Sequence, residues 1–320
     1  MGGLLAELGK RIAERWLTLL VLPGALYLAA LATAQTLGHA HPVDLTRLSR
    51  RLDQWAAAAQ PHSSSRIALV LLGLLLAAAA AGLAAQALGS LAERLALAAD
   101  WEQWPKRARR LARRRVARRR EQWLAASERY AREREEAAAA RARAHRAGGS
   151  AQPLPTDGLG TAYAALVRIA PELPERPTWM GDRLAVVATR LDRDLDLDLA
   201  TVWPHLWLSV PDATRTEVTA ARGDLTRAAS LAGWGLLYGA VGALWWPGAL
   251  LAAAITATAW RRARAATDAY ATLVEAVCRL HTAALARELG LEVSGPVTRP
   301  VGAELTRLLQ TGQRYEGPGH

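Results

Sequence analysis

The sequence contains no phenylalanine, one cysteine and only two methionines among its 320 residues. The single Cys278 cannot form an intrachain disulfide or a cysteine-only metal cluster, so both kinds of framework are excluded. Lysine is also scarce, because every basic residue apart from Lys10 and Lys106 is arginine. The excess of arginine and alanine is typical of a G+C-rich bacterial coding bias and is not a physical requirement.

Known catalytic signatures are missing as well. The chain contains no GxGxxG, GxxxxGK[ST], HExxH or GxSxG pattern. His205 is a conceivable proton-transfer group, but it has no carboxylate or nucleophile beside it in sequence. We therefore expect no catalytic residues, no cofactor, no bound metal and no enzymatic activity.

Charge is absent from three long runs, at 16–37, 67–92 and 228–260. A membrane-spanning helix needs roughly 20 consecutive apolar residues. The first two runs therefore each predict one spanning helix. The alternative is a buried core helix, which suits the second run least because that run is apolar on every side.

The third run is long for one span and short for two. Its middle is Trp245-Trp246-Pro247-Gly248, where proline and glycine favour a turn. Basic residues flank both ends of the run, which places both ends on the cytoplasmic side: Arg222, Arg227, Arg261, Arg262 and Arg264. A hairpin of two short helices is favoured over a single long tilted helix.

The remaining charges predict the threading. Basic residues precede the first run at Lys10, Arg11 and Arg15, and many more follow the second run, whereas the loop between the two runs has few. The positive-inside rule then places both termini in the cytoplasm of a bacterial cell, with the protein in its plasma membrane. Ala32-Thr33-Ala34 also resembles a signal-peptide cleavage site, although the length of the run favours an uncleaved anchor.

The predicted fold class is an all-α integral membrane protein. It has four transmembrane helices, two single spans plus a C-terminal hairpin, and a mainly helical cytoplasmic module. The expected segments are a two-helix membrane region 1–92 with an external loop 38–65, a basic and charged helix 93–147, a linker 148–155, a helical module 156–227 with helices at 161–169 and 182–191, a hairpin 228–260, an amphipathic helix 261–290 and a flexible tail 291–320 with a brief helix at Leu305, Leu308 and Leu309.

The external loop predicts a short amphipathic helix. Asp44 is placed to cap it, and Leu45, Leu48, Leu52 and Trp55 recur at helical spacing. Three histidines lie in or beside the loop, at His39, His41 and His62. Because an HxH pattern without a further ligand is a weak metal signal, we do not assign a metal there.

The segment 106–120 is the most basic part of the chain. Its cations are Lys106, Arg107, Arg109, Arg110, Arg113, Arg114, Arg115, Arg118, Arg119 and Arg120. A basic cluster just inside a membrane helix can bind anionic headgroups, and a narrow stripe of Ala108, Leu111, Ala112 and Val116 is expected to face the bilayer. A solvated helix remains the plain alternative. Nucleic acid is disfavoured because the cluster lacks stacking aromatics and a reading motif.

Aspartates alternate along 192–198, as they do in calcium-binding loops. The glycine and the final glutamate of an EF-hand are absent in either register, where Leu197 or Leu199 and Trp203 or His205 stand instead. A solvated or arginine-paired acidic turn is therefore favoured over a divalent-cation site.

Two apolar elements predict a partner or packing surface. The first is WPHLW, with Trp203, Pro204, His205 and Trp207, and the second is the helix 263–289, with Tyr270, Leu273, Val277 and Leu280 on its apolar face. In the hairpin, Gly235 and Gly239 form a GxxxG pattern that predicts close helix packing.

TWMGDRLAVV at 178–187, DLDLATVWPHLW at 196–207, the hairpin and the helix after it resemble a group of uncharacterised bacterial multi-pass membrane proteins. The resemblance covers roughly residues 155–290. His205 stands where that group has arginine in a WPRLW element. The resemblance implies a membrane architecture and adds no activity.

These patterns lead to two hypotheses of function. The first is a non-enzymatic membrane anchor or adaptor that presents its helical module to a cytoplasmic protein partner while its basic helix lies on anionic lipid. The alternative is a self-assembling membrane effector or channel, in which the small-residue hairpin mediates homo-oligomerisation. An enzyme acting on lipid ranks third. A transporter is disfavoured because no ionisable residue interrupts the predicted spans.

Overall fold

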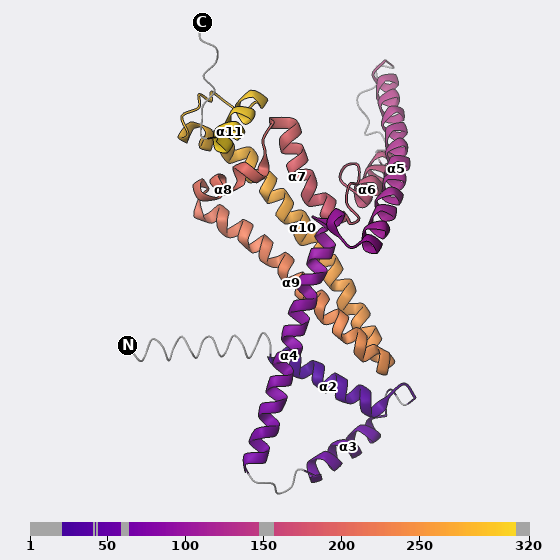
Figure 1. Ribbon diagram of the computed structural model, residues 1–320. Coiled ribbons are helices and arrows are strands. Elements are labelled where there is room, and N and C mark those ends of the chain that lie inside the picture. The colour runs from indigo at the N-terminus through magenta and orange to yellow at the C-terminus, as the bar shows by residue number, and fades with distance from the viewer. Residues whose placement is uncertain (1–20, 41, 43, 59–63, 147–156, 312–320) are drawn as a thin grey trace, which may run out of the picture. The chain divides into compact units, whose positions relative to one another are not determined.

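The computed structural model describes residues 21–40, 42, 44–58, 64–146 and 157–311. Within these ranges every regular element is a helix, so the all-helical prediction is confirmed (Figure 1). The chain divides into two compact units. Unit 1 comprises Met1–Glu93 and Gly223–Ala263, and unit 2 comprises Arg94–Arg222 and Arg264–His320.

Unit 1 contains α2 (Leu22–Leu37), α3 (Leu45–Ala58) and most of α4 (Ser64–Leu97). It also contains the adjoining ends of α9 (Asp212–Leu244) and α10 (Trp246–Glu288), which form a hairpin. The two arms separate at Trp245, whose carbonyl accepts a hydrogen bond from the Gly248 amide at 2.9 Å. The segment 228–260 is therefore a hairpin of two helices and not one long helix.

Glycines allow the helices of unit 1 to approach closely. A Cβ at Gly233 of α9 would overlap the Ala85 carbonyl of α4, and a Cβ at Gly89 of α4 would overlap the Ala229 carbonyl of α9. Ala85 and Gly89 are one helical turn apart, as are Ala229 and Gly233. Two small-xxx-small pairs therefore face each other, which is the packing mode typical of helices in membranes.

The number of membrane spans is smaller than predicted. Among the described residues, α4 alone is long and apolar enough to cross a membrane, over Ile67–Leu97. Helix α2 has 16 described residues. The uncharged hairpin arms, 228–244 and 246–260, are each shorter than the roughly 20 residues that a spanning helix needs, and they contain several glycine and aromatic residues. Four spans are therefore not supported by helix length and composition.

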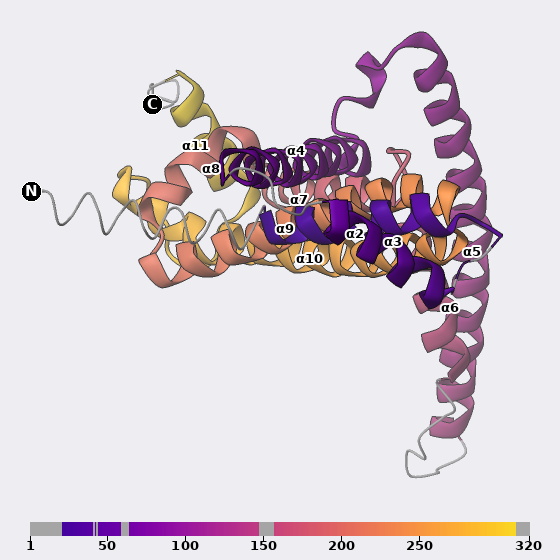
Figure 2. The same ribbon diagram turned by 90° about the horizontal axis from the view of Figure 1, so that it is seen from below.

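Unit 2 contains η2 (Trp101–Gln103), α5 (Lys106–Arg146), α6 (Asp157–Ile169), α7 (Trp179–Leu195), α8 (Leu199–Ser209) and α11 (Arg299–Thr311). Helices α5 and α6 lie side by side, as Figure 2 shows, and Tyr130 and Tyr163 meet with ring centroids 5.5 Å apart. The main core lies where α7, α8 and α11 meet the C-terminal part of α10, and its fully buried side chains include Leu191, Leu197 and Leu206.

The brief helix predicted within the tail 291–320 is present, and it is packed into the main core. Residues Arg299–Thr311 form α11, and its Leu305 is fully buried in the main core. Gly302 makes this docking possible, because a Cβ there would overlap the Leu195 carbonyl at the end of α7. Long-range packing of this kind leaves no mark on the local glycine and proline content from which the tail was predicted.

Several predictions concern residues outside the described ranges. These are the basic residues Lys10, Arg11 and Arg15, the start of the first apolar run at 16–20, the histidines His41 and His62, and the linker 148–155. Within the described part of the external loop, the Asp44 carboxylate accepts a hydrogen bond from the Arg47 amide at 2.9 Å. The predicted cap of this helix is thereby confirmed.

Candidate lipid-binding surface and aromatic groove

Three arginines of the basic segment are used to build unit 2. Arg115 donates from Nε to the Pro177 carbonyl at 2.9 Å, and Arg120 donates from Nε to the Pro174 carbonyl at 2.7 Å. Arg119 donates to the carbonyls of Ile169 and Arg176. Proline cannot donate a backbone hydrogen bond and breaks regular structure, so the loop between α6 and α7 relies on these side chains for its shape. Arg115, Arg119 and Arg120 therefore hold this loop in addition to the predicted contact with lipid.

The Arg119–Asp182 ion pair lies at the centre of this arrangement. The Asp182 side chain is almost completely buried, with 4 % of its surface exposed, and Arg119 retains 11 %. The other Asp182 oxygen accepts hydrogen bonds from the amides of Glu175 and Arg176 at 3.0 and 2.7 Å. A buried ion pair is tolerated when its remaining hydrogen-bonding groups are satisfied in this way. It joins α5, the loop and the first turn of α7.

The same loop holds the C-terminal end of α4. The Thr178 hydroxyl donates to the Ala96 carbonyl and accepts from the Gly181 amide at 3.0 Å, so it caps α7 and binds α4 at once. Arg176 donates from Nη1 to the Leu97 carbonyl at 3.4 Å. Carbonyls at a helix C-terminus have no partner within their own helix, and these contacts supply one.

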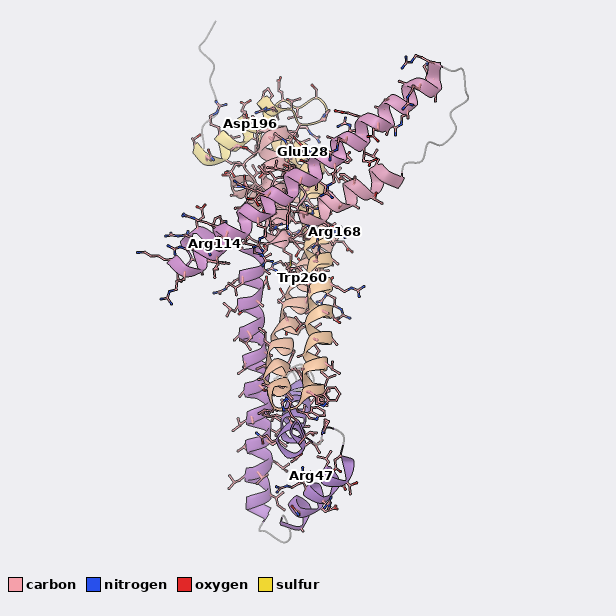
Figure 3. All side chains as sticks on the ribbon, turned by 90° about the vertical axis from the view of Figure 1, so that its right-hand side faces the viewer. Arg47, Arg114, Glu128, Arg168, Asp196 and Trp260 are labelled. Carbon is pink, nitrogen blue, oxygen red and sulfur yellow. The ribbon has the colours of Figure 1, made fainter. Side chains whose placement is uncertain are left out.

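The opposite face of α5 carries the exposed cations. Arg107, Arg110, Arg114 and Arg118 follow one another at three- and four-residue spacing and therefore share one side of the helix. All four are exposed, and the structure gives them no carboxylate partner among the described residues. Figure 3 labels Arg114 in this row, where the side chains project away from the helix. We call these four residues the arginine row.

The apolar stripe of this helix behaves differently from the prediction. Ala112 and Val116 are buried inside unit 2, so they cannot face a bilayer. Leu111 is 65 % exposed and lies beside the arginine row. The prediction placed all of them on one face because small apolar residues at helical spacing are equally suited to protein and to lipid. The structure divides them between the two sides of α5.

An aromatic groove of about 380 Å³ opens between α8, α9 and α10. Trp203 and Trp207, with ring centroids 5.7 Å apart, form one wall together with Pro204. Tyr270 of α10 also lines the groove. The sequence therefore predicted four of the lining residues. His205 is exposed and does not line the groove, and its Nδ1 lies 3.2 Å from the Thr201 carbonyl of its own helix.

The packed face of α10 is rotated from the predicted one. Val277 is buried in a small cluster with Val210 and Val218, with Leu273 packed against it, whereas Leu280 is 74 % exposed. The most buried positions are small or polar ones: Thr267, Ala271, Cys278, Thr282 and Ala286. A search of the sequence for large apolar residues at helical spacing does not select these small or polar positions. Val277 and Leu273 are consequently packing residues and not part of a free docking face.

The acidic segment 192–198 is paired with arginine, as favoured from the sequence. Arg279 donates to Asp194 at 2.8 Å, and this hydrogen bond lowers the pKa of the Asp194 carboxyl. Asp198 caps α8, and the hydrogen bond from the Thr201 hydroxyl lowers the pKa of the Asp198 carboxyl. Asp196, labelled in Figure 3, ends α7 in a left-handed conformation with φ 55°. No group of three candidate metal ligands occurs among the described residues.

Of the two glycines predicted to pack closely in the hairpin, Gly235 lies at a close helix contact and Gly239 does not. A Cβ at Gly235 would lie 2.5 Å from the Thr256 hydroxyl of α10, so this glycine is needed for the hairpin contact. A Cβ at Gly239 would have no atom of the described residues within 4 Å. The tighter contacts are those of Gly233 and Gly89, which the search for a single GxxxG pattern on one helix did not identify.

Sequence reasoning also missed Arg176 and Arg264. The Arg264 guanidinium lies over the Trp179 ring, 4.0 Å from its centroid, and donates to the Arg168 carbonyl at 2.8 Å. Burial, followed by the neighbouring charges of Arg119 and Arg168, lowers the pKa of Arg264. Arg264 was predicted only as a flanking charge of the hairpin, and no pattern in the sequence pairs it with Trp179.

The chain matches no protein-family model, no curated protein and no solved structure at a significant level.

Proposed function

We propose that the protein is a non-enzymatic membrane anchor or adaptor. In this proposal unit 1 lies in the plasma membrane of a bacterium, the arginine row of α5 binds anionic lipid at the inner surface, and unit 2 presents the aromatic groove to a cytoplasmic protein partner. One observation carries the proposal. Helix α4 exposes its apolar side chains, and the chain that follows it exposes a row of arginines that have no acidic partner in the described part of the chain.

Exposure of α4 supports the membrane location. Only 17 % of its most apolar stretch is buried within the protein. Its large exposed side chains include Ile67, Leu69, Val70, Leu71 and Leu72. Soluble proteins seldom expose a continuous apolar surface of this size, because its contact with water is unfavourable. Lipid chains would cover this surface without that cost.

A contact between the hairpin and the external loop supports the predicted threading. The Trp245 indole at the hairpin tip donates a hydrogen bond to the Pro42 carbonyl at 2.9 Å. Both residues belong to unit 1. The positive-inside rule assigns both segments to the outer side, so their contact agrees with four membrane passes and with cytoplasmic termini. The short α2 and hairpin arms would then require local thinning of the bilayer.

The arginine row supports the lipid contact. A cation close to an anionic membrane surface contributes about 1 kcal/mol, so four of them provide about 4 kcal/mol in total. Leu111 adds an apolar side chain on the same face of the helix. Since the arginines have no ion pairs among the described residues, none has to be broken before lipid binds.

Depth-dependent quenching tests the lipid contact. The full-length chain with Cys278→Ala carries a fluorophore at Leu111→Cys and is placed in nanodiscs that contain quencher-labelled lipid. We expect the fluorophore at position 111 to be quenched in phosphatidylglycerol discs, and this quenching should weaken as the salt concentration rises. In phosphatidylcholine discs the quenching should be lost. Replacing the arginine row by glutamine should abolish it. Equal quenching in both lipids would contradict the proposal.

The matched control removes the same number of charges from the distal part of α5. Replacing Arg129, Arg132, Arg134 and Arg141 by glutamine should leave the quenching at position 111 unchanged. If the distal variant lost as much quenching as the row variant, total charge and not the row would determine binding.

The partner site is tested at Trp207. We expect Trp207→Ala to remove a protein that purifies stably with the full-length chain, since truncating a central aromatic anchor typically costs 2 kcal/mol or more of binding free energy. Leu208→Ala is the control, because Leu208 is exposed on the same helix but does not line the groove. Equal recovery of the protein with both variants would contradict a docking role for the groove.

A further inference from the structure

A second cavity, of about 480 Å³, opens beside the first turns of α5. Trp101 of η2 and Val116 of α5 provide apolar lining. The volume is within the range of pockets that hold small molecules. The arginine row is not part of this cavity, because none of its four members lines it.

Three guanidinium groups line the cavity. Arg120 and Arg176 are each held by a backbone carbonyl, Pro174 for the first and Leu97 for the second. A carbonyl orients a guanidinium without neutralising it, so both groups keep their charge and lose less freedom on binding a ligand. Arg113 is exposed and has no partner among the described residues. These three arginines present charged donors to one cavity.

Two carboxylates balance part of this charge. Glu102 and Glu175 also line the cavity, and neither forms an ion pair with its arginines. Three positive and two negative groups leave one net positive charge, 3 − 2 = +1. A ligand with a single negative charge balances this lining. A polyphosphate or a nucleic acid would bring further negative charge against the two glutamates.

The position in the chain selects a lipid as the source of that anion. Trp101 follows the last residue of α4, Leu97, by four residues, which is at most about 14 Å of extended chain. Helix α4 ends the candidate span, and tryptophan is enriched where membrane and water meet. The apolar lining from Trp101 and Val116 suits the glycerol and the first carbons of an acyl chain.

We propose that the cavity between η2, α5 and the loop before α7 binds the phosphodiester of one phospholipid headgroup through Arg113, Arg120 and Arg176. This site rests on the proposed membrane location of α4, but it is separate from the arginine row. The row binds a charged surface of many lipids, whereas the cavity binds one lipid molecule. The two glutamates limit the charge of the headgroup that it accepts.

Native mass spectrometry of the full-length chain in mild detergent tests this site with dimyristoylphosphatidylglycerol as the probe. We expect one tightly bound lipid per chain. Arg113→Gln should weaken its binding about tenfold, the effect of losing one charge-assisted hydrogen bond. Arg114→Gln is the matched control, because the neighbouring arginine belongs to the row and does not line the cavity. Equal weakening by both variants would overturn the proposal.

Two further arms test the ligand. Glu175→Gln should strengthen lipid binding, because it removes a negative charge from the lining; weaker binding would contradict the assigned role of the glutamates. Inorganic phosphate, added at the same concentration as the lipid, should not displace the bound lipid. Full displacement would mean that the cavity binds free phosphate, and it would overturn the proposal of a lipid ligand.

The two proposals fail in different ways. If Leu111 is quenched by anionic lipid but Arg113→Gln retains its bound lipid, the cavity is wrong and the anchor proposal stands. If the single lipid is lost in Arg113→Gln but Leu111 shows no quenching, the arginine row is wrong and the cavity stands.

Discussion

Asp182 shows how a single residue organises unit 2. Its carboxylate receives Arg119 and two backbone amides, and these partners come from α5 and from the loop before α7. Removing one member of such a pair leaves a buried charge without compensation. The Arg119–Asp182 ion pair is therefore important for stability mainly because removing one partner would leave the other charge buried and unpaired.

Replacing Asp182 by asparagine should reduce the free energy of unfolding by about 3–5 kcal/mol. Asp212→Asn is the control, because Asp212 is 94 % exposed and pairs with Arg215 at the surface. Such surface pairs contribute about 1 kcal/mol or less. Chemical denaturation in mild detergent measures both variants, and a similar small effect for the two would show that the Asp182 network is not stabilising.

Cys278 provides a test that depends on pH. Burial raises the pKa of the Cys278 thiol to about 12. Maleimide labelling of the folded protein at pH 8 should be slower than that of an exposed cysteine by on the order of a thousandfold, since the thiolate is the reactive form. Leu280→Cys in a Cys278→Ala background supplies the exposed reference. Comparable labelling rates would contradict the buried position of Cys278.

The same thiol has a defined effect on stability. An unfolded cysteine has a pKa of about 8.5. Because the pKa of the Cys278 thiol is higher in the folded protein than in the unfolded chain, the contribution of this residue to the free energy of unfolding is complete below about pH 8. It falls as the pH rises toward 12. The stability difference between the protein and Cys278→Ala should therefore decrease with rising pH.

At the scale of helices, the sequence predicted positions better than contacts. The predicted helices 161–169 and 182–191 lie within α6 and α7, and the hairpin turn falls at Trp245 as the Trp-Trp-Pro-Gly stretch indicated. These features depend on local preferences. The roles of Arg115, Arg119 and Arg120 were missed because their carbonyl partners lie about fifty residues or more away in sequence.

Close packing of α4 against α9 leads to opposite predictions for two glycines. Gly233→Ala should lower the melting temperature in detergent, because the new Cβ would overlap the Ala85 carbonyl. Gly239→Ala should leave stability unchanged or raise it by about 0.5–1 kcal/mol, because alanine favours a helix and the site is open. If Gly233→Ala were the more stable of the two, the close helix contact would be wrong.

Docking of α11 is the second test at this scale. Gly302→Ala should release α11 from α7 and make 299–311 more susceptible to proteolysis. Gly160→Ala in α6 is the control, since no atom of the described residues lies within 4 Å of a Cβ at that site. Equal proteolysis of the two variants would mean that α11 does not depend on its contact with Leu195.

For the whole molecule, the anchor and the alternative effector or channel predict different masses. The glycine contacts of α4, α9 and α10 are made within one chain, as Gly233 with Ala85 and Gly235 with Thr256. We therefore expect a monomer or dimer in mild detergent after correction for bound detergent. A defined higher oligomer that also causes leakage of dye from vesicles would favour the channel.

The central claim is that α4 crosses the membrane between the external loop and unit 2. Three cysteines in a Cys278→Ala background report on it: Asp53→Cys in α3, Trp246→Cys at the hairpin tip and Gln103→Cys in η2. A membrane-impermeant maleimide is added to sealed vesicles of known orientation. Labels at 53 and 246 on the outer side and at 103 on the inner side are the predicted result, whereas labelling of 53 and 103 from the same side would contradict the account.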